Sequence, residues 1–170
     1  MQKQNLIVLI GIPGCGKSTF ADHARNEAWM TVISTDEIRE ELTGEAGSQE
    51  RNKDVFPLAY GRTRRALEEG KDVVFDATNV TRSSRKQVLS CIPDRNSIRV
   101  TYVWFDVPLT KCIQRNRTRD RQVPEPVIKR FSSHFETPLI GGEDFDRIVV
   151  SFNGGDDAWF KAQAAHCFKD

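Results

Sequence analysis

The chain has 170 residues, of which 38% are apolar and 29% are charged, and its 25 Lys and Arg residues against 24 Asp and Glu residues leave a formal net charge of +1. This composition excludes a disordered or fibrous protein, and it is sufficient for one domain whose core forms without disulfides or metal. The near-neutral total also argues against a protein that coats long nucleic acids, because such binding needs many uncompensated cations.

Apolar, strand-like runs alternate with helical segments along the chain. We expect strands at residues 6–10, 30–34, 72–75, 98–105 and 147–152. We expect helices from residue 18 past residue 28 and at residues 36–42, 52–69, 83–91, 109–115, 125–135 and 157–166, with a loop at residues 43–49. This alternation predicts an α/β fold with a central parallel sheet of about five strands flanked by helices.

The segment from Gly11 to Ser18 matches the pattern GxxxxGK[ST] in full and lies between a predicted strand and a predicted helix. The glycines let backbone N–H groups turn toward phosphate oxygens, and the start of the helix adds its positive dipole end. Lys17 is expected at the β and γ phosphates, and Ser18 at Mg²⁺. The nucleotide is therefore predicted to contact Gly11, Pro13, Gly14, Cys15, Gly16, Lys17, Ser18 and Thr19, with Cys15 as a small filler.

Phosphoryl transfer also needs a base for the acceptor hydroxyl and a group that holds the acceptor. Asp36 follows the second predicted strand, whose carboxyl end faces the same crevice as the phosphate loop in a parallel sheet. Arg39 is three residues further and shares one face of a helix with Asp36. Asp36 is the candidate base and Arg39 the candidate acceptor-holding cation; the alternative is that Asp36 only caps the helix.

Asp76, Thr78 and Asn79 end the third predicted strand. Asp76 is a candidate for contact with Mg²⁺ through water, and the other two are candidates for neutral hydrogen bonds to the substrate. The alternative is that these residues close the strand and cap the next helix.

Four arginines alternate with polar residues between two proline-started helices, at about residues 115–123, which we call the lid. The planar fork of arginine suits phosphates better than the point charge of lysine. We expect at least one of these arginines in the active site; a solvated charge run is the alternative. The lid arginines are Arg115, Arg117, Arg119 and Arg121.

The segments GIPGCGKST, VISTDEIR, VVFDATNV and RNRTRDRQVP together resemble the kinase domain of bacterial and phage polynucleotide 5′-hydroxyl kinases, which are P-loop phosphotransferases. The resemblance covers about residues 5 to 152. It implies a P-loop NTPase fold and transfer of the γ-phosphate of ATP or another NTP, aided by Mg²⁺, to the 5′-OH end of DNA or RNA. It also implies that Asp36 is the base, that Arg39 contacts the acceptor's neighbouring phosphate, and that Arg119 stabilises the transferred group.

Some assignments within this resemblance stay open. The lid is about one residue shorter than in the family, so Arg117 or Arg121 is the alternative to Arg119. Arg121 is also expected at the nucleotide, and Arg82 at the substrate. The catalytic set is thus Lys17, Asp36, Arg39 and Arg119. Rival functions are a P-loop kinase for another hydroxyl, such as a modified DNA base, a nucleoside or a small metabolite, and a nucleotide-dependent ATPase or switch.

Charge distribution sharpens the expected partner. Residues 81–130 hold 12 basic and 4 acidic side chains, whereas the remainder of the chain is net acidic. This stretch contains the lid together with Arg82, Arg85 and Lys86. We therefore expect a short grip on a few phosphates of a nucleic acid end, with a mild salt dependence.

The same sequence predicts the setting and extent of the domain. The run from Leu6 to Ile10 is too short for a signal-peptide core, and no run reaches the roughly 18 apolar residues of a membrane span. The four cysteines form no CxxC pair, and the three histidines have no ligand-like spacing. We expect a cytoplasmic protein with reduced thiols, no structural metal and no membrane partner, and a single domain over residues 1–170 in which the tail 153–170 has no assigned role.

Overall fold

The computed structural model describes residues 3–28, 30–44 and 52–153. Its centre is a five-stranded sheet in the order β2-β3-β1-β4-β5, in which each neighbouring pair is parallel. The strands are β1 (Gln4–Ile10), β2 (Thr31–Ser34), β3 (Val73–Asp76), β4 (Ile98–Phe105) and β5 (Arg147–Ser151). The expected α/β fold with a parallel sheet is confirmed.

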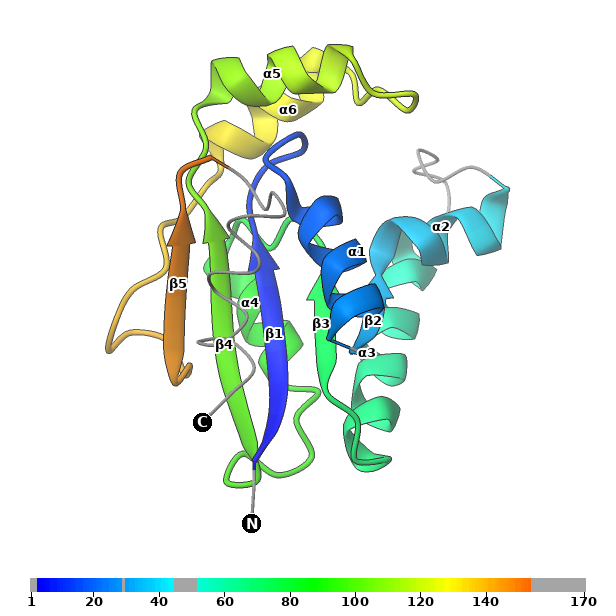
Figure 1. The fold of residues 1–170 in the computed structure, drawn as a ribbon, viewed down its shortest axis with the longest axis vertical. Coiled ribbons are helices and arrows are strands. Elements are labelled where there is room, and N and C mark those ends of the chain that lie inside the picture. Colours follow the sequence, from blue (N-terminus) through cyan, green and yellow to red (C-terminus); the bar gives the residue numbers. More distant parts are fainter. Residues whose placement is uncertain (1–2, 29, 45–51, 154–170) are drawn as a thin grey trace.

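Helices cover the sheet on both faces (Figure 1). They are α1 (Lys17–Glu27), α2 (Thr35–Thr43), α3 (Asn52–Glu68), α4 (Arg82–Leu89), α5 (Leu109–Arg117) and α6 (Glu125–Ser133). Apolar side chains of α1, α5 and α6 pack on one face, and those of α2, α3 and α4 pack on the other. This is the three-layer arrangement that buries a parallel sheet from both sides.

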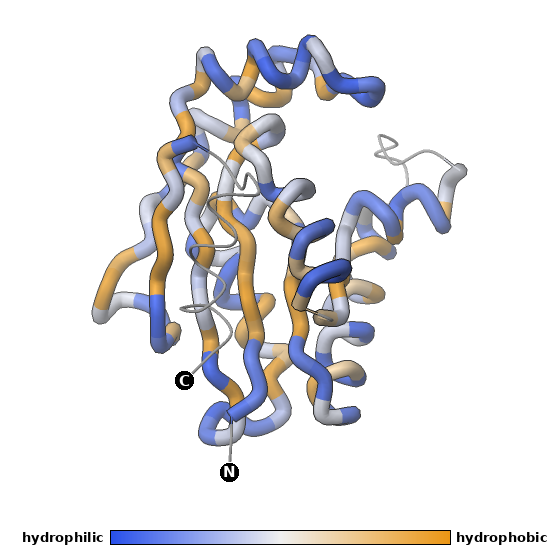
Figure 2. Tube along the Cα trace, viewed as in Figure 1, coloured by the Kyte–Doolittle hydropathy of each residue, from blue (hydrophilic) through white to orange (hydrophobic). Residues whose placement is uncertain are grey.

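Strand β1 runs through the middle of the core. All residues from Leu6 to Ile10 are fully buried, and Figure 2 shows the apolar character along this strand. Ile7 and Leu9 face α1, whereas Leu6, Val8 and Ile10 face the other helical layer. Both faces of β1 are therefore covered by helices. This explains why its sequence is continuously apolar and does not alternate between apolar and polar residues.

Most element boundaries differ from the sequence expectation by one or two residues. The largest functional consequence is in α5, which continues to Arg117, so Arg115 and Arg117 lie in its last turn and not in the lid loop. The predicted helix at 157–166 and most of the predicted loop at 43–49 lie outside the described residues.

Within the described part of the chain, no helix is both long and apolar enough to span a membrane. Cys15, Cys91 and Cys112 are buried free thiols, as expected for reduced cysteines, whereas Cys167 lies outside the described residues.

Candidate active site

The phosphate loop connects the end of β1 to the start of α1, and its backbone requires glycine. Gly14 and Gly16 have φ angles of 86° and 109°, which L-residues with a side chain rarely adopt. A Cβ atom on Gly14 would also lie 2.4 Å from the carbonyl oxygen of Cys112. The loop is therefore folded tightly against α5, and the glycine pattern has a steric cause as well as a role in binding.

Lys17 begins α1 and turns back over the loop. Its Nζ donates to the carbonyl oxygens of Gly11 at 2.7 Å and Ile12 at 3.1 Å, and the side chain is buried. The first turn of α1 holds no acidic residue, so its N–H groups and dipole are not opposed by a local carboxylate. The loop thus presents the features of an anion site at a helix N-terminus.

A cleft of about 160 Å³ opens beside α1 at the carboxyl ends of β2 and β3. Its lining joins a residue of the phosphate loop to the candidate base and to two lid arginines. The lining residues are Ser18, Ala21, Asp22, Ser34, Asp36, Glu37, Glu40, Asp76, Arg119 and Arg121. A larger hollow of about 450 Å³ lies at the opposite end of the sheet, but none of the predicted site residues line it.

Asp36 stands between two arginines in this cleft. Its Oδ1 accepts a hydrogen bond from Arg39 Nη1 at 2.6 Å, and its Oδ2 pairs with Arg121 Nη2 at 3.0 Å. The three-residue spacing along α2 therefore places a carboxylate and a guanidinium side by side, as the sequence predicts. The N-cap of α2 is Ser34, not Asp36, so the carboxylate of Asp36 faces the cleft cations.

Asp76 ends β3 directly opposite Ser34 of β2 and lines the same cleft. Burial raises the pKa of Asp76 to about 6; the Lys17 ammonium opposes this shift, and the Asp36 carboxylate adds to it. The described residues hold no cluster of three His, Cys, Asp or Glu side chains suited to a metal. The hydroxyl of Ser18 and the carboxyl of Asp76 nevertheless fit Mg²⁺, which takes few protein oxygens when it also binds substrate phosphates.

The raised pKa of Asp76 predicts a pH-dependent stability. Because the folded state holds this proton up to about pH 6 and the unfolded state releases it near pH 4, stability should fall as pH rises through this window. Asp76→Asn removes the buried charge and should raise the free energy of unfolding at pH 8 by up to about 3 kcal/mol, with little gain at pH 4. Denaturant unfolding in EDTA at the two pH values measures this difference.

Asp22→Asn is the matched control, because Asp22 lines the same cleft but its side chain is 67% exposed. It should leave the stability difference between the two pH values as in the wild type. Equal stability of Asp76→Asn and the wild type at pH 8 would contradict the burial of a charge at Asp76.

The lid loop between α5 and α6 is closed by one amide. Asn116 is buried, its Nδ2 donates to the carbonyl of Val123 at 2.8 Å, and its Oδ1 accepts from the N–H of Val123 at 2.9 Å. This clamp holds the loop that carries Arg119 and Arg121 over the cleft. The arrangement separates these two arginines from the other two of the predicted set.

Arg115 and Arg117 point elsewhere. Arg115 donates to the carbonyl of Asn153, and Arg117 pairs with Glu125 of α6 at 3.2 Å. Neither lines the cleft. The geometry therefore favours Arg119 or Arg121 as the active-site arginine, and it leaves Arg117 as a weaker alternative.

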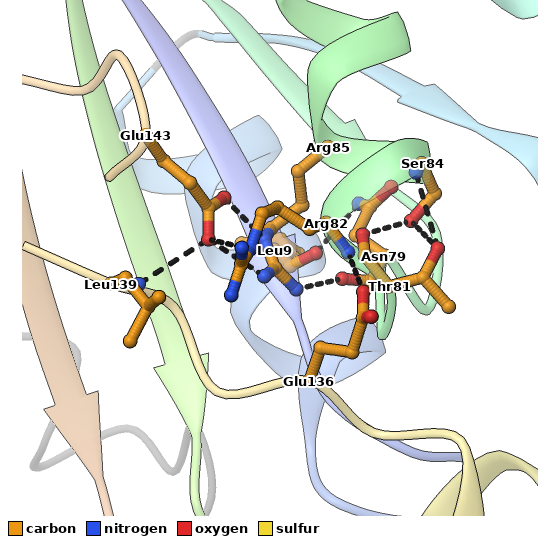
Figure 3. A network of polar contacts seen from close by, with 9 residues as sticks. All are labelled: Leu9, Asn79, Thr81, Arg82, Ser84, Arg85, Glu136, Leu139 and Glu143. Atoms are coloured by element: carbon orange, nitrogen blue, oxygen red, sulfur yellow. Dashed lines mark hydrogen bonds and ion pairs between the residues drawn. The ribbon is translucent and has the colours of Figure 1, made fainter.

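Three predicted substrate contacts are not brought to the cleft. Thr78 accepts the N–H of Gly11 at 2.9 Å through its carbonyl, and buried Asn79 donates from Nδ2 to the carbonyl of Leu9 at 2.7 Å. Arg82 lies at the start of α4 beside two glutamates, as Figure 3 shows. Thr78 and Asn79 support the end of β1, in line with the alternative that they close the strand, whereas Arg82 begins α4.

The other residues predicted to contact the nucleotide differ in how exposed they are. Cys15 is buried, Pro13 is half-buried and Thr19 is exposed.

Arg85, which the sequence analysis places among the basic residues expected to meet nucleic acid, is fully buried and paired with Glu143. The positive excess of residues 81–130 is therefore smaller on the surface than the sequence indicates.

Three acidic residues that line the cleft were not predicted from the sequence. Asp22, Glu37 and Glu40 line it, and Glu37 pairs with Arg25 of α1 at 2.7 Å. A signal existed for two of them: Asp22 is four residues after Ser18, and Glu40 is four residues after Asp36, so each pair shares a helix face.

The sequence matches the family described as an AAA domain over residues 6–138. The L-seryl-tRNA(Sec) kinase of Methanococcus maripaludis is 30% identical over 141 residues, which cover 78% of this chain and 53% of that protein. This chain therefore spans about half the length of that curated relative.

Two solved structures share the fold at low identity. A fungal RNA kinase is 19% identical with a TM-score of 0.67, covering 99% of this chain and 87% of that one. A gluconokinase from Sinorhizobium meliloti 1021 is 18% identical with a TM-score of 0.64, covering 96% and 91%. The fold is that of P-loop kinases, whose acceptors differ from one neighbour to the next.

Proposed function

We propose, from the premise that this chain belongs to the AAA domain family, that the protein is a P-loop kinase acting on 5′-hydroxyl ends of DNA or RNA. The observation that carries the proposal is the position of Asp36 in one cleft with Ser18 of the phosphate loop, flanked by Arg39 and Arg121. A carboxylate between two guanidiniums suits an acceptor that brings both a hydroxyl and a nearby phosphate.

The transfer step assigns one task to each group. The acceptor oxygen bonds to the γ-phosphorus, the bond to the bridging oxygen of the leaving diphosphate breaks, and the acceptor proton passes to Asp36. Lys17 and the loop N–H groups hold the phosphates, and Arg119 stabilises the charge on the transferred group. Ser18, and Asp76 through water, would hold Mg²⁺, which supplies further neutralisation of phosphate charge.

The acceptor's adjacent phosphate is assigned to Arg39. Its side chain is 9% exposed and held at 2.6 Å by Asp36, so its guanidinium is fixed beside the base. We further propose that residues 1–170 act as one kinase domain with the lid at about residues 115–123.

A second candidate is a kinase for another hydroxyl. The 30% identity to an L-seryl-tRNA(Sec) kinase favours the hydroxyl of a seryl group on tRNA, and the gluconokinase fold is compatible with a small metabolite. In both cases the phosphate loop would be used in the same way, and only the acceptor side of the cleft would differ.

The test offers γ-labelled ATP and Mg²⁺ with several acceptors: 5′-OH DNA and RNA oligonucleotides, a nucleoside, gluconate, L-seryl-tRNA, or water alone. We expect label on the 5′-OH oligonucleotides and none on the same oligonucleotides that already carry a 5′-phosphate. Label on another acceptor alone would replace the proposal with the second candidate. Release of free phosphate without any labelled acceptor would indicate an ATPase.

A further inference from the structure

Arg85 of α4 and Glu143 of the segment before β5 form a buried ion pair (Figure 3). Arg85 Nε lies 2.7 Å from Glu143 Oε2 and Nη2 lies 2.8 Å from Oε1, with side chains that are 0% and 5% exposed. Burial acts to raise the pKa of Glu143, but hydrogen bonding to Arg85 and its charge outweigh it and hold this pKa below its ordinary value. The pair is therefore ionised at neutral pH.

Stability alone is a weak explanation for such a pair. Removing two charges from water is costly, and apolar residues of similar volume are often at least as stabilising. The alternative is that the pair fixes a geometry that apolar packing would leave loose.

A third hydrogen bond of Arg85 leads to the phosphate loop. Its Nη1 donates to the carbonyl of Asn79 at 3.0 Å. Asn79 has a φ angle of 47°, a left-handed conformation that is uncommon outside glycine but that asparagine adopts more readily than most residues. Its Nδ2 in turn donates to the carbonyl of Leu9 at 2.7 Å, two residues before the loop begins at Gly11.

The same segment holds the loop itself. The N–H of Gly11 donates to the carbonyl of Thr78, next to Asn79, at 2.9 Å. The conformation of residues 78 and 79 therefore sets where β1 ends and where the phosphate-binding backbone starts. Arg85 is bonded to this segment through the carbonyl of Asn79.

Glu143 connects the ion pair to the chain segment that follows α6. Its Oε1 accepts the N–H of Leu139 at 3.3 Å. Glu136, just after α6, donates its N–H to the carbonyl of Val80 at 2.8 Å and accepts the N–H of Arg82. The chain that follows α6 and the start of the phosphate loop are thus both hydrogen-bonded to one short segment, residues 78–85.

We propose that Arg85 and Glu143 are a positioning pair for the nucleotide, which fixes the phosphate loop through Asn79. Asp36 and Arg39 bond to each other on α2, and Asp36 pairs with Arg121 of the lid, whereas the bonds from Arg85 through Asn79 lead to the phosphate loop. The pair should therefore act on nucleotide binding and not on acceptor binding. This inference rests on the proposed function only in that the loop binds a nucleotide.

The test uses Arg85→Met/Glu143→Leu, which removes both charges and refills the volume, together with the single variant Glu143→Ala. Titration with a fluorescent ATP analogue and Mg²⁺ should give a dissociation constant about tenfold higher for both, because displaced loop N–H groups form weaker charge-assisted hydrogen bonds with the phosphates. The KM for the acceptor should stay near that of wild type. In the double variant the thermal midpoint should also stay near wild type, which separates positioning from stability.

Asp144→Ala is the matched control: it breaks the neighbouring surface pair with Arg95, at 3.1 Å, without touching residues 78–85. It should leave the dissociation constant unchanged. A folded double variant that binds the analogue as well as wild type overturns the proposal, and so does a loss of affinity in Glu143→Ala that the double variant restores. Failure of the wild type itself to bind the analogue would instead contradict the proposed kinase function.

Discussion

Replacing Asp36 with asparagine is expected to slow phosphoryl transfer by about three orders of magnitude while nucleotide affinity stays near that of the wild type. General-base catalysis contributes roughly 10²- to 10⁴-fold, and an asparagine keeps the size and one acceptor oxygen but cannot take the proton. The phosphate loop connects β1 to α1, whereas Asp36 lies on α2. The substitution should therefore change the transfer rate without changing nucleotide affinity. Single-turnover rates with labelled ATP, beside a nucleotide titration, measure both.

Glu37→Gln is the control for this change. Glu37 is adjacent to Asp36 and lines the same cleft, but its carboxylate is occupied by Arg25. Its loss should alter the transfer rate only slightly. A near-normal rate in Asp36→Asn would show that Asp36 is structural and that the base lies elsewhere.

Replacing Arg119 with alanine should reduce the rate of transfer by about 10³-fold, the lower end of what an arginine that stabilises the transferred phosphoryl group contributes. Arg121→Ala should have a smaller effect on the transfer rate and a larger effect on the KM for the acceptor, because Arg121 pairs at 3.0 Å with Asp36, the candidate base, and not with the nucleotide site where the sequence predicted it. Steady-state kinetics with both substrates varied distinguish the two.

Arg117→Ala provides the matched lid control, since Arg117 points to Glu125 and its side chain is 69% exposed. It should be nearly silent, because an exposed ion pair contributes little. If Arg121→Ala abolishes transfer and Arg119→Ala does not, the roles of the two lid arginines are exchanged. If only Arg117→Ala is damaging, the placement of the lid is wrong.

The sheet could be read from the sequence because its signals are local. The run from Leu6 to Ile10 is aliphatic throughout since both faces of β1 are covered, and β4 was predicted with its observed bounds, Ile98–Phe105. Strand and helix ends were less accurate because they depend on pairing partners. For example, β1 begins at Gln4 because Gln4 pairs with Ile98 of β4.

The lid shows where local reading fails. Four arginines at alternate positions look equivalent in the sequence, but α5 continues through Arg117 and the Asn116 clamp closes the loop beyond it. With the loop closed in this way, Arg119 and Arg121 line the cleft. Arg115 and Arg117 do not line it. Asn79 was likewise predicted at the substrate, because the carbonyl of Leu9 that its side chain binds lies 70 positions away in the sequence.

The phosphate loop and the pairing of Asp36 with Arg39 could be predicted from the sequence, since both depend on contacts within a few residues: left-handed glycines, a helix start and a three-residue spacing along a helix. The tertiary structure alone decided which lid arginines face Asp36, and it alone joined Arg85 to Glu143 across 58 residues. The physical reason is that a charged side chain is assigned by the partner it meets, and these partners come from distant segments that only folding brings together.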